Sequence, residues 1–201
     1  MLDPRAKEVL PVPIAQHHWP VGTCSWKTIC EMVEAGIIQR VKSLDQVSAA
    51  SLDLRLGKRI KVESRGHVEI NKREPGSFFD IEADKETGRL ITLSPGQCIL
   101  AESVERFSLP LDVAVMVYTR STPGRVFFEH LTSGFCDPGW NNSVLTLELK
   151  NCSQYHTIGL HAGDSVVQMK FEILPEPVPF ERSYAARGHY NGDGVVTGAK
   201  G

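Results

Sequence analysis

Four side chains that could hold an anion are gathered in the stretch "RSTPGR", residues 120–125, directly after an apolar run. They are the guanidinium groups of Arg120 and Arg125 and the hydroxyl groups of Ser121 and Thr122. Both kinds of group donate well-directed hydrogen bonds and therefore suit phosphate oxygens. Taken alone, the stretch also fits the solvated tip of a hairpin, so the residues leave both interpretations open.

Polar and turn-forming residues continue through "HLTSGFCDPGW", residues 130–140, well beyond the two to five residues that a hairpin connection needs. A glutamate, Glu148, then lies within the strand-like run "LTLELKN". Because side chains of a strand alternate between its faces, Glu148 points away from the leucines. Considered alone, it fits a residue that faces water.

Alternating apolar residues predict that β-strands position these side chains. The run "AASLDLRLGKRIKVE" has this pattern, with Leu52, Leu54 and Leu56 on one face. Four later segments continue it: "GRLITLSPGQCILAESVERFSLP", "VAVMVYTR", "SVLTLELKN" and "HTIGLHAGDSVVQMKFEIL". One short amphipathic helix is expected over "SWKTICEMVEAGII", residues 25–38. The pattern therefore predicts a mainly β fold, a barrel or jelly-roll-like sandwich with a short N-terminal helix.

The chain of 201 residues fits one large domain. Residues 1–20 carry four prolines and little periodicity, which indicates an extended N-terminal arm. Residues 21–175 hold the predicted strands and form the single β domain. Residues 176–201 are rich in Pro and Gly and are expected to form a flexible tail.

The composition indicates which partners and which cellular compartment to expect. The formal net charge is −2, from 22 basic and 24 acidic residues, which gives no general attraction to nucleic acid or to a membrane surface. No apolar run approaches the roughly 20 residues that span a bilayer. The five cysteines include no C-x-x-C pair and suit reduced thiols. We therefore expect a cytoplasmic protein that binds neither nucleic acid nor membranes.

Several common site motifs do not occur. The chain has neither H-x-E with P-C-x-x-C nor H-E-x-x-H, the signatures of zinc deaminases and zinc hydrolases. It also has no G-x-x-x-x-G-K-[ST] phosphate loop and no G-x-S-x-G nucleophile elbow. A metal ion held by protein side chains is therefore not expected.

Six segments, in order, resemble the dCTP deaminase branch of the trimeric dUTPase superfamily, and they are distributed over residues 50–197. They are "ASLDLRLG" at 50–57, "RSTPGR" at 120–125, "HLTSGFCDPGW" at 130–140, "TLELKN" at 146–151, "GDSVVQMKF" at 163–171 and "HYNGDGVVT" at 189–197. The resemblance implies a distorted β-barrel of the dUTPase type and a homotrimer with active sites at subunit boundaries.

The resemblance also implies a reaction, the hydrolytic loss of ammonia from C4 of the cytosine of dCTP, which gives dUTP. Family members use no zinc and carry Mg²⁺ on the substrate phosphates. Glu148 matches the general base that takes a proton from water. Ser121 and Arg125 match the residues that hold this water and stabilise the developing charge.

Other matches imply contacts with the nucleotide. Arg120 and Thr122 fall on the phosphate-facing turn, and Gln168 falls on the phosphate-binding glutamine. Tyr190 matches a tail tyrosine that closes over the nucleotide.

Three further matches concern the sugar and the base. Asp137 matches an aspartate near the deoxyribose, although Asp-Pro-Gly is also a turn signal by itself. His130 and Thr132 match the cytosine side of the site. A structural role in the core fits His130 about as well.

The departures from the family pattern bear on the substrate. His189 and Asp193 stand where the tail normally has a lysine and a glutamine, which reduces positive charge near the phosphates and leaves their number open. Ser133 adds a hydroxyl where the motif has alanine. One residue more than usual in "WNNSVLTLE" means that Glu148 reaches its place only through a bulge or a longer turn.

Two other functions remain on the same scaffold. One is a dUTPase, or a bifunctional enzyme that continues from dUTP to dUMP, although Trp140 stands where such dUTPases have a tyrosine. The other is a nucleotide-binding regulator that has lost the reaction. Because all three share one fold, only the site can distinguish them.

Overall fold

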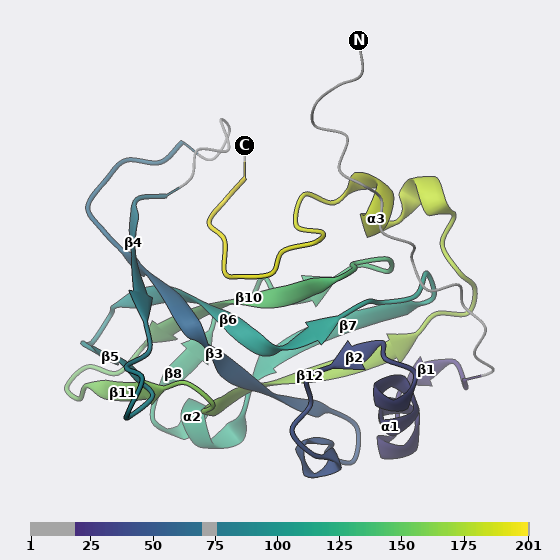
Figure 1. Ribbon diagram of the computed structural model, residues 1–201, viewed down its shortest axis with the longest axis horizontal. Coiled ribbons are helices and arrows are strands. Elements are labelled where there is room, and N and C mark those ends of the chain that lie inside the picture. The colour runs from purple at the N-terminus through teal and green to yellow at the C-terminus, as the bar shows by residue number, and fades with distance from the viewer. Residues whose placement is uncertain (1–18, 70–75, 201) are drawn as a thin grey trace.

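The computed structural model describes residues 19–69 and 76–200 and is mainly β, as the sequence predicts (Figure 1). The predicted arm falls largely on residues 1–18, outside the described residues. The strands are β1 Gly22–Thr23, β2 Ile38–Gln39, β3 Leu52–Glu63, β4 Phe78–Glu82, β5 Arg89–Leu93, β6 Cys98–Phe107, β7 Val113–Thr119, β8 Phe128–His130, β9 Phe135–Cys136, β10 Ser143–Asn151, β11 Ile158–His161 and β12 Ser165–Ile173. The helices are α1 Trp26–Glu34, α2 Ser121–Arg125 and α3 Tyr184–Arg187, with 3-10 turns η1 Leu44–Gln46 and η3 Phe180–Arg182.

Most strands join one curled sheet that forms a half-barrel (Figure 1). Its order is β8-β10-β6-β3-β12-β7-β9, with β1 added beside β12, β2 beside β6 and β4 beside β3. Strands β11 and β5 form a separate two-stranded sheet. Neighbouring strands in both sheets run antiparallel. This arrangement confirms the distorted, barrel-like β fold.

The predicted strand faces are confirmed in β3. Leu52, Leu54 and Leu56 are fully buried, whereas the polar side chains between them reach other elements. Asp53 pairs with Arg120 after β7 at 2.8 Å, and Arg55 pairs with Glu105 on β6 at 2.7 Å. One face of β3 therefore contributes leucines to the core, and the other face forms ion pairs with two neighbouring segments.

Of two local structures predicted around the sheet, the helix is confirmed and the hairpin turn is not. Helix α1 is present where the helical spacing predicts it and buries Ile29 and Met32 against the core. The segment read as a hairpin turn, residues 120–125, is instead the single-turn helix α2, which begins after Arg120. A Pro near the start of a helix is compatible with the first turn, because its missing N–H would have no partner there.

The C-terminal segment after β12 crosses the sheet above β10 and ends beside β4 (Figure 1). The carbonyl of Asp193 accepts a hydrogen bond from the Val144 amide at 2.8 Å, and the Trp140 indole donates to the Tyr190 carbonyl at 3.2 Å. Val196 is only 5% exposed. In this conformation residues 176–200 form a cover over the sheet, and the predicted flexibility of the tail stays a prediction.

Candidate functional site

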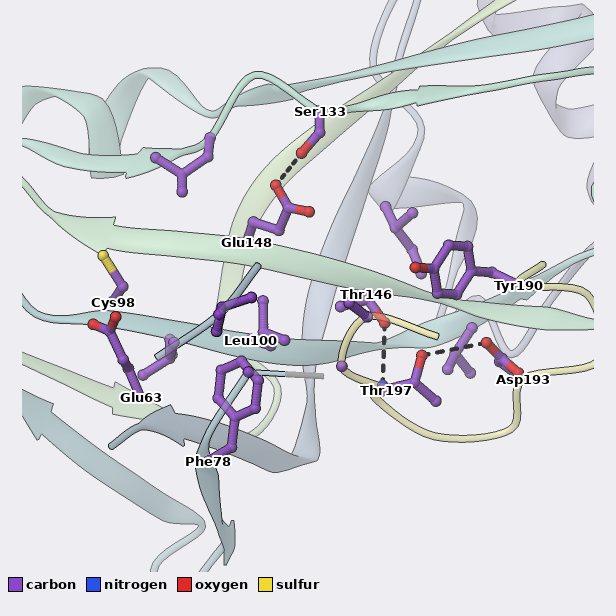
Figure 2. A pocket seen from close by; sticks show the side chains of 18 of the residues that line it. Glu63, Phe78, Cys98, Leu100, Ser133, Thr146, Glu148, Tyr190, Asp193 and Thr197 are labelled. Atoms are coloured by element: carbon purple, nitrogen blue, oxygen red, sulfur yellow. Dashed lines mark hydrogen bonds between the residues drawn. The ribbon is translucent and has the colours of Figure 1, made fainter. Parts of the chain in front are cut away.

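A cavity of about 660 Å³ lies on the outer face of strands β10 and β6 (Figure 2). Its floor includes Glu148 and Thr146 of β10 and Leu100 of β6. Glu148 and Leu100 are register partners, so their side chains share one face of the sheet. Leu147 and Leu149 are fully buried on the opposite face. The alternation of β10 therefore points Glu148 into the cavity.

The walls of the cavity come from segments far apart in the chain. Phe78 at the start of β4 forms one side, and Tyr190, Asp193 and Thr197 of the C-terminal segment form another (Figure 2). The Thr197 amide donates to Thr146 Oγ1 at 3.4 Å. The C-terminal segment thus contributes both a wall and a contact with the strand that carries Glu148.

The predicted irregularity before Glu148 is confirmed. The register between β10 and β6 shifts between Val144 and Thr146, as a β-bulge requires. Asn142, just before the strand, has a φ of 48°, a conformation that asparagine tolerates better than most residues. The extra residue is therefore absorbed before Glu148, and the side-chain alternation after the bulge is regular.

Glu148 has a specific partner in the loop between β8 and β9. The Ser133 hydroxyl donates a hydrogen bond to Glu148 Oε2 (Figure 2). Ser133 also lines the cavity. The hydroxyl that distinguishes this chain from the motif it resembles therefore contacts the candidate base directly.

The charged side chains among the described residues that line the cavity are all carboxylates. Three carboxylates line it, from Glu63, Glu148 and Asp193, and its described lining residues include no Lys, Arg or His. The Lys200 ammonium lies 2.6 Å from Asp193 Oδ2 and 5.1 Å from the centre of the Tyr190 ring, and so neutralises one carboxylate. Carboxylates accept hydrogen bonds, so this cavity suits an amino-bearing base better than a phosphate chain.

The other predicted catalytic residues lie outside this cavity. Ser121 and Arg125 are exposed on α2 and are not among its lining residues. Arg120 is held by Asp53 and by the Ser165 carbonyl, at 2.8 and 3.1 Å. Burial raises the pKa of Asp53, and the adjacent Arg120 partly offsets this effect. Within one chain, therefore, the predicted phosphate turn does not line the cavity that holds the predicted base.

His130 is buried, and its Nε2 has no hydrogen-bond partner among the described residues. Burial lowers the pKa of its imidazole, while the charge of Glu148 acts in the opposite direction. A histidine with a lowered pKa is neutral at pH 7.

The remaining predicted binding residues divide by location. Tyr190 and Asp193 line the cavity. Those outside its lining are His130, Thr122, Thr132, Asp137, Gln168 and His189. Their predicted roles stay predictions.

The sequence patterns did not single out several of the lining residues. Phe78 and Leu100 give the cavity its apolar surface, and Thr146 and Thr197 link strand and tail. Leu100 was detectable in principle, because strict alternation along β6 places it opposite the buried Ile99 and Ala101.

In the part of the chain that the structure describes, no three His, Cys, Asp or Glu side chains gather as a metal ion would require. Within the same residues, no helix has the length and apolar character needed to cross a membrane.

The fold and site define a class of protein, a β half-barrel with a cavity of about 660 Å³ around a strand-borne glutamate. A family model described as "dCTP deaminase-like" matches residues 24–174. The chain therefore belongs to the dCTP deaminase-like family.

Individual relatives agree with this assignment. A "dCTP deaminase, dUMP-forming" of Dictyoglomus turgidum is 32% identical over 72% of this chain and 76% of its own length. One of the same description from Methanothermobacter thermautotrophicus is 32% identical over 86% and 87%. A "dCTP deaminase" of Natronomonas pharaonis is 35% identical over 70% and 72%.

Among solved structures, the 2'-deoxycytidine 5'-triphosphate deaminase from Agrobacterium tumefaciens matches with a TM-score of 0.61. The match is 20% identical and covers 76% of this chain and 48% of that one. This likeness supports the fold.

Proposed function

We propose that the protein catalyses the hydrolytic deamination of dCTP to dUTP and ammonia, with Glu148 as the general base. The observation that carries the proposal is the Glu148 carboxylate in a cavity of about 660 Å³, in a chain of the dCTP deaminase-like family. A cavity of this size suits a nucleoside. Its apolar surfaces from Phe78 and Leu100 suit a base, and its carboxylates suit the cytosine amino group.

The chemistry needs one proton acceptor that later returns its proton. Glu148 takes a proton from water while the water oxygen bonds to C4 of the cytosine. Glu148 delivers this proton to the ring nitrogen N3, where it stays. The carboxylate then takes the hydroxyl proton at C4 and passes it to the amino group, so that the C4–N bond breaks, C4=O forms and ammonia leaves. Water and dCTP thus give dUTP and ammonia without an additional reactant. Mg²⁺ on the phosphates would offset their charge during binding.

We infer that a homotrimer completes the site. The described residues that line the cavity include three carboxylates and no Lys, Arg or His, whereas Ser121 and Arg125 lie exposed on α2, outside the cavity. A site that joins the cavity of one subunit to the α2 of another would place cations beside the triphosphate. We therefore propose that Arg125 and Ser121 act in the site of a neighbouring subunit, together with the turn residues Arg120 and Thr122.

A second activity, conversion of the dUTP product to dUMP, is favoured by the comparisons. Two of the relatives described above are named dUMP-forming. Such an enzyme would release pyrophosphate after water attacks the α-phosphate, and dUTP would not accumulate.

The proposed reaction is tested by incubating the purified protein with dCTP, dCMP and dUTP, each with Mg²⁺ or with EDTA. We expect ammonia and a uracil nucleotide from dCTP with Mg²⁺, and much slower turnover with EDTA. The product, dUTP or dUMP, distinguishes the two activities by chromatography. Nucleotide binding with no turnover of any substrate would contradict both and favour the regulator.

The C-terminal cover is proposed to close over the nucleotide and exclude water from it. Arg182 and Arg187 are exposed cleavage sites for trypsin within this segment. We expect dCTP to slow cleavage at both sites in a Glu148→Gln variant, which should convert the nucleotide far more slowly. The two rates are compared by mass spectrometry with and without dCTP, and equal rates would rule out closure.

A further inference from the structure

We propose that Ser133 is a positioning residue for the general base, which it fixes by holding one carboxylate oxygen of Glu148. This inference rests on the proposed deaminase function. The two side chains come from different elements, Ser133 from the loop after β8 and Glu148 from β10, and they point toward each other (Figure 2).

The chemistry of the pair fixes which group donates. An ionised carboxylate can only accept hydrogen bonds, so the Ser133 hydroxyl must donate its proton to Oε2. Hydrogen bonds to a charged partner are about twice as strong as neutral ones. Among the hydrogen bonds of the described residues, no other side chain donates to this carboxylate. The second oxygen, Oε1, therefore stays available to take the proton from water.

The backbone on both sides of Ser133 is fixed. The Leu131 amide donates to the Glu148 carbonyl at 2.8 Å, and the Val117 amide donates to the Gly134 carbonyl at 2.8 Å. A Cβ at Gly134 would lie 2.9 Å from the Cβ and the carbonyl oxygen of Val117, so only glycine allows this approach to β7. The backbone of Ser133 is thus held between two strands, which keeps its exposed side chain beside the Glu148 carboxylate.

The Ser133 hydrogen bond matters because the Glu148 side chain would otherwise be free to rotate. Its side chain is half-buried and faces an open cavity, where several rotamers of a glutamate are accessible. Proton transfer depends on the orientation of the base relative to the attacking water. Ser133 selects one orientation before the substrate arrives. The alanine of the motif that this chain resembles has no group for this task.

The test compares Ser133→Ala with Ser133→Thr in steady-state kinetics on dCTP. Removal of the hydroxyl should lower kcat about tenfold and leave KM within about twofold, because orientation is lost and nucleotide contacts are kept. Ser133→Thr keeps the hydroxyl and should recover most of kcat. Ser43→Ala is the matched control, since Ser43 also donates to a carboxylate, Asp45 at 3.1 Å, but on the exposed surface away from the cavity.

A double-mutant cycle adds a readout that a purely structural role would not give. In a Glu148→Gln background, Ser133→Ala should cause little further loss, because both changes disable the same group. If the wild-type protein deaminates dCTP and the Ser133→Ala variant has the same kcat, this inference is wrong and the proposed function stands. The inference is also wrong if Ser133→Ala lowers both kcat and the melting temperature and Ser133→Thr does not restore kcat. A wild-type protein that deaminates no cytosine nucleotide would overturn the proposed function and this inference together.

Discussion

Glu148→Gln is expected to lower kcat for dCTP deamination by about 10²- to 10⁴-fold. The amide keeps the shape of the side chain and can still accept the Ser133 hydrogen bond, but it cannot take a proton from water. The fold and nucleotide binding should therefore be kept. The measurement is ammonia release under saturating dCTP, with nucleotide affinity determined in parallel.

Glu129→Gln is the matched control for this variant. Glu129 is an exposed carboxylate on the adjacent strand β8, it accepts a hydrogen bond from Thr119 at 2.9 Å, and it does not line the cavity. Its substitution should leave kcat unchanged. A Glu148→Gln protein with more than a tenth of the wild-type kcat would assign the base to another group.

The same variant tests whether active sites are shared between subunits. Glu148→Gln and Arg125→Ala should each be nearly inactive alone. In the proposed homotrimer, a 1:1 mixture of both chains should recover roughly a quarter of the wild-type activity. This fraction follows because a working site needs Glu148 from one subunit and Arg125 from its neighbour, each intact with a chance of about one half. Mixed trimers without activity would place both residues in a site made by one chain.

The strands and their buried faces could be predicted well, because side-chain alternation along a strand is a local pattern. The period-two alternation of β3 and β10 identified the buried leucines and the face of Glu148, and the extra residue before Glu148 indicated the bulge. The turn at residues 120–125 was harder, because a Ser-Thr-Pro-Gly run fits both a turn and the first turn of a helix.

The cavity could be predicted only in part, since its walls depend on contacts between distant segments. Phe78 enters through the pairing of β4 with β3, and Lys200 reaches Asp193 through the path of the C-terminal segment. The Ser133 hydroxyl could be recognised as unusual, but its partner depends on the placement of the β8–β9 loop over β10. No single stretch of sequence contains that information.

Glu105→Ala should destabilise the protein by about 3–5 kcal/mol, the usual loss when one partner of a buried ion pair is removed. Glu105 is fully buried on β6. Its carboxylate accepts hydrogen bonds from the Arg55 amide at 3.0 Å, from Arg55 Nε at 2.7 Å and from Gln46 Nε2 at 3.0 Å. Alanine would leave these donors, including a guanidinium that is only 17% exposed, without their acceptor.

The free energy of unfolding in urea, compared at one protein concentration, measures this effect. Asp80→Ala is the control, because Asp80 on β4 also pairs with a cation of β3, Lys61, at 2.7 Å, but is 73% exposed. Loss of such a surface pair should cost less than about 1 kcal/mol. Equal losses in the two variants would mean that water replaces the Glu105 contacts. A much larger loss for Glu105→Ala would mean that burial, rather than the short contact distance that both pairs share, decides what the β3–β6 ion pair contributes.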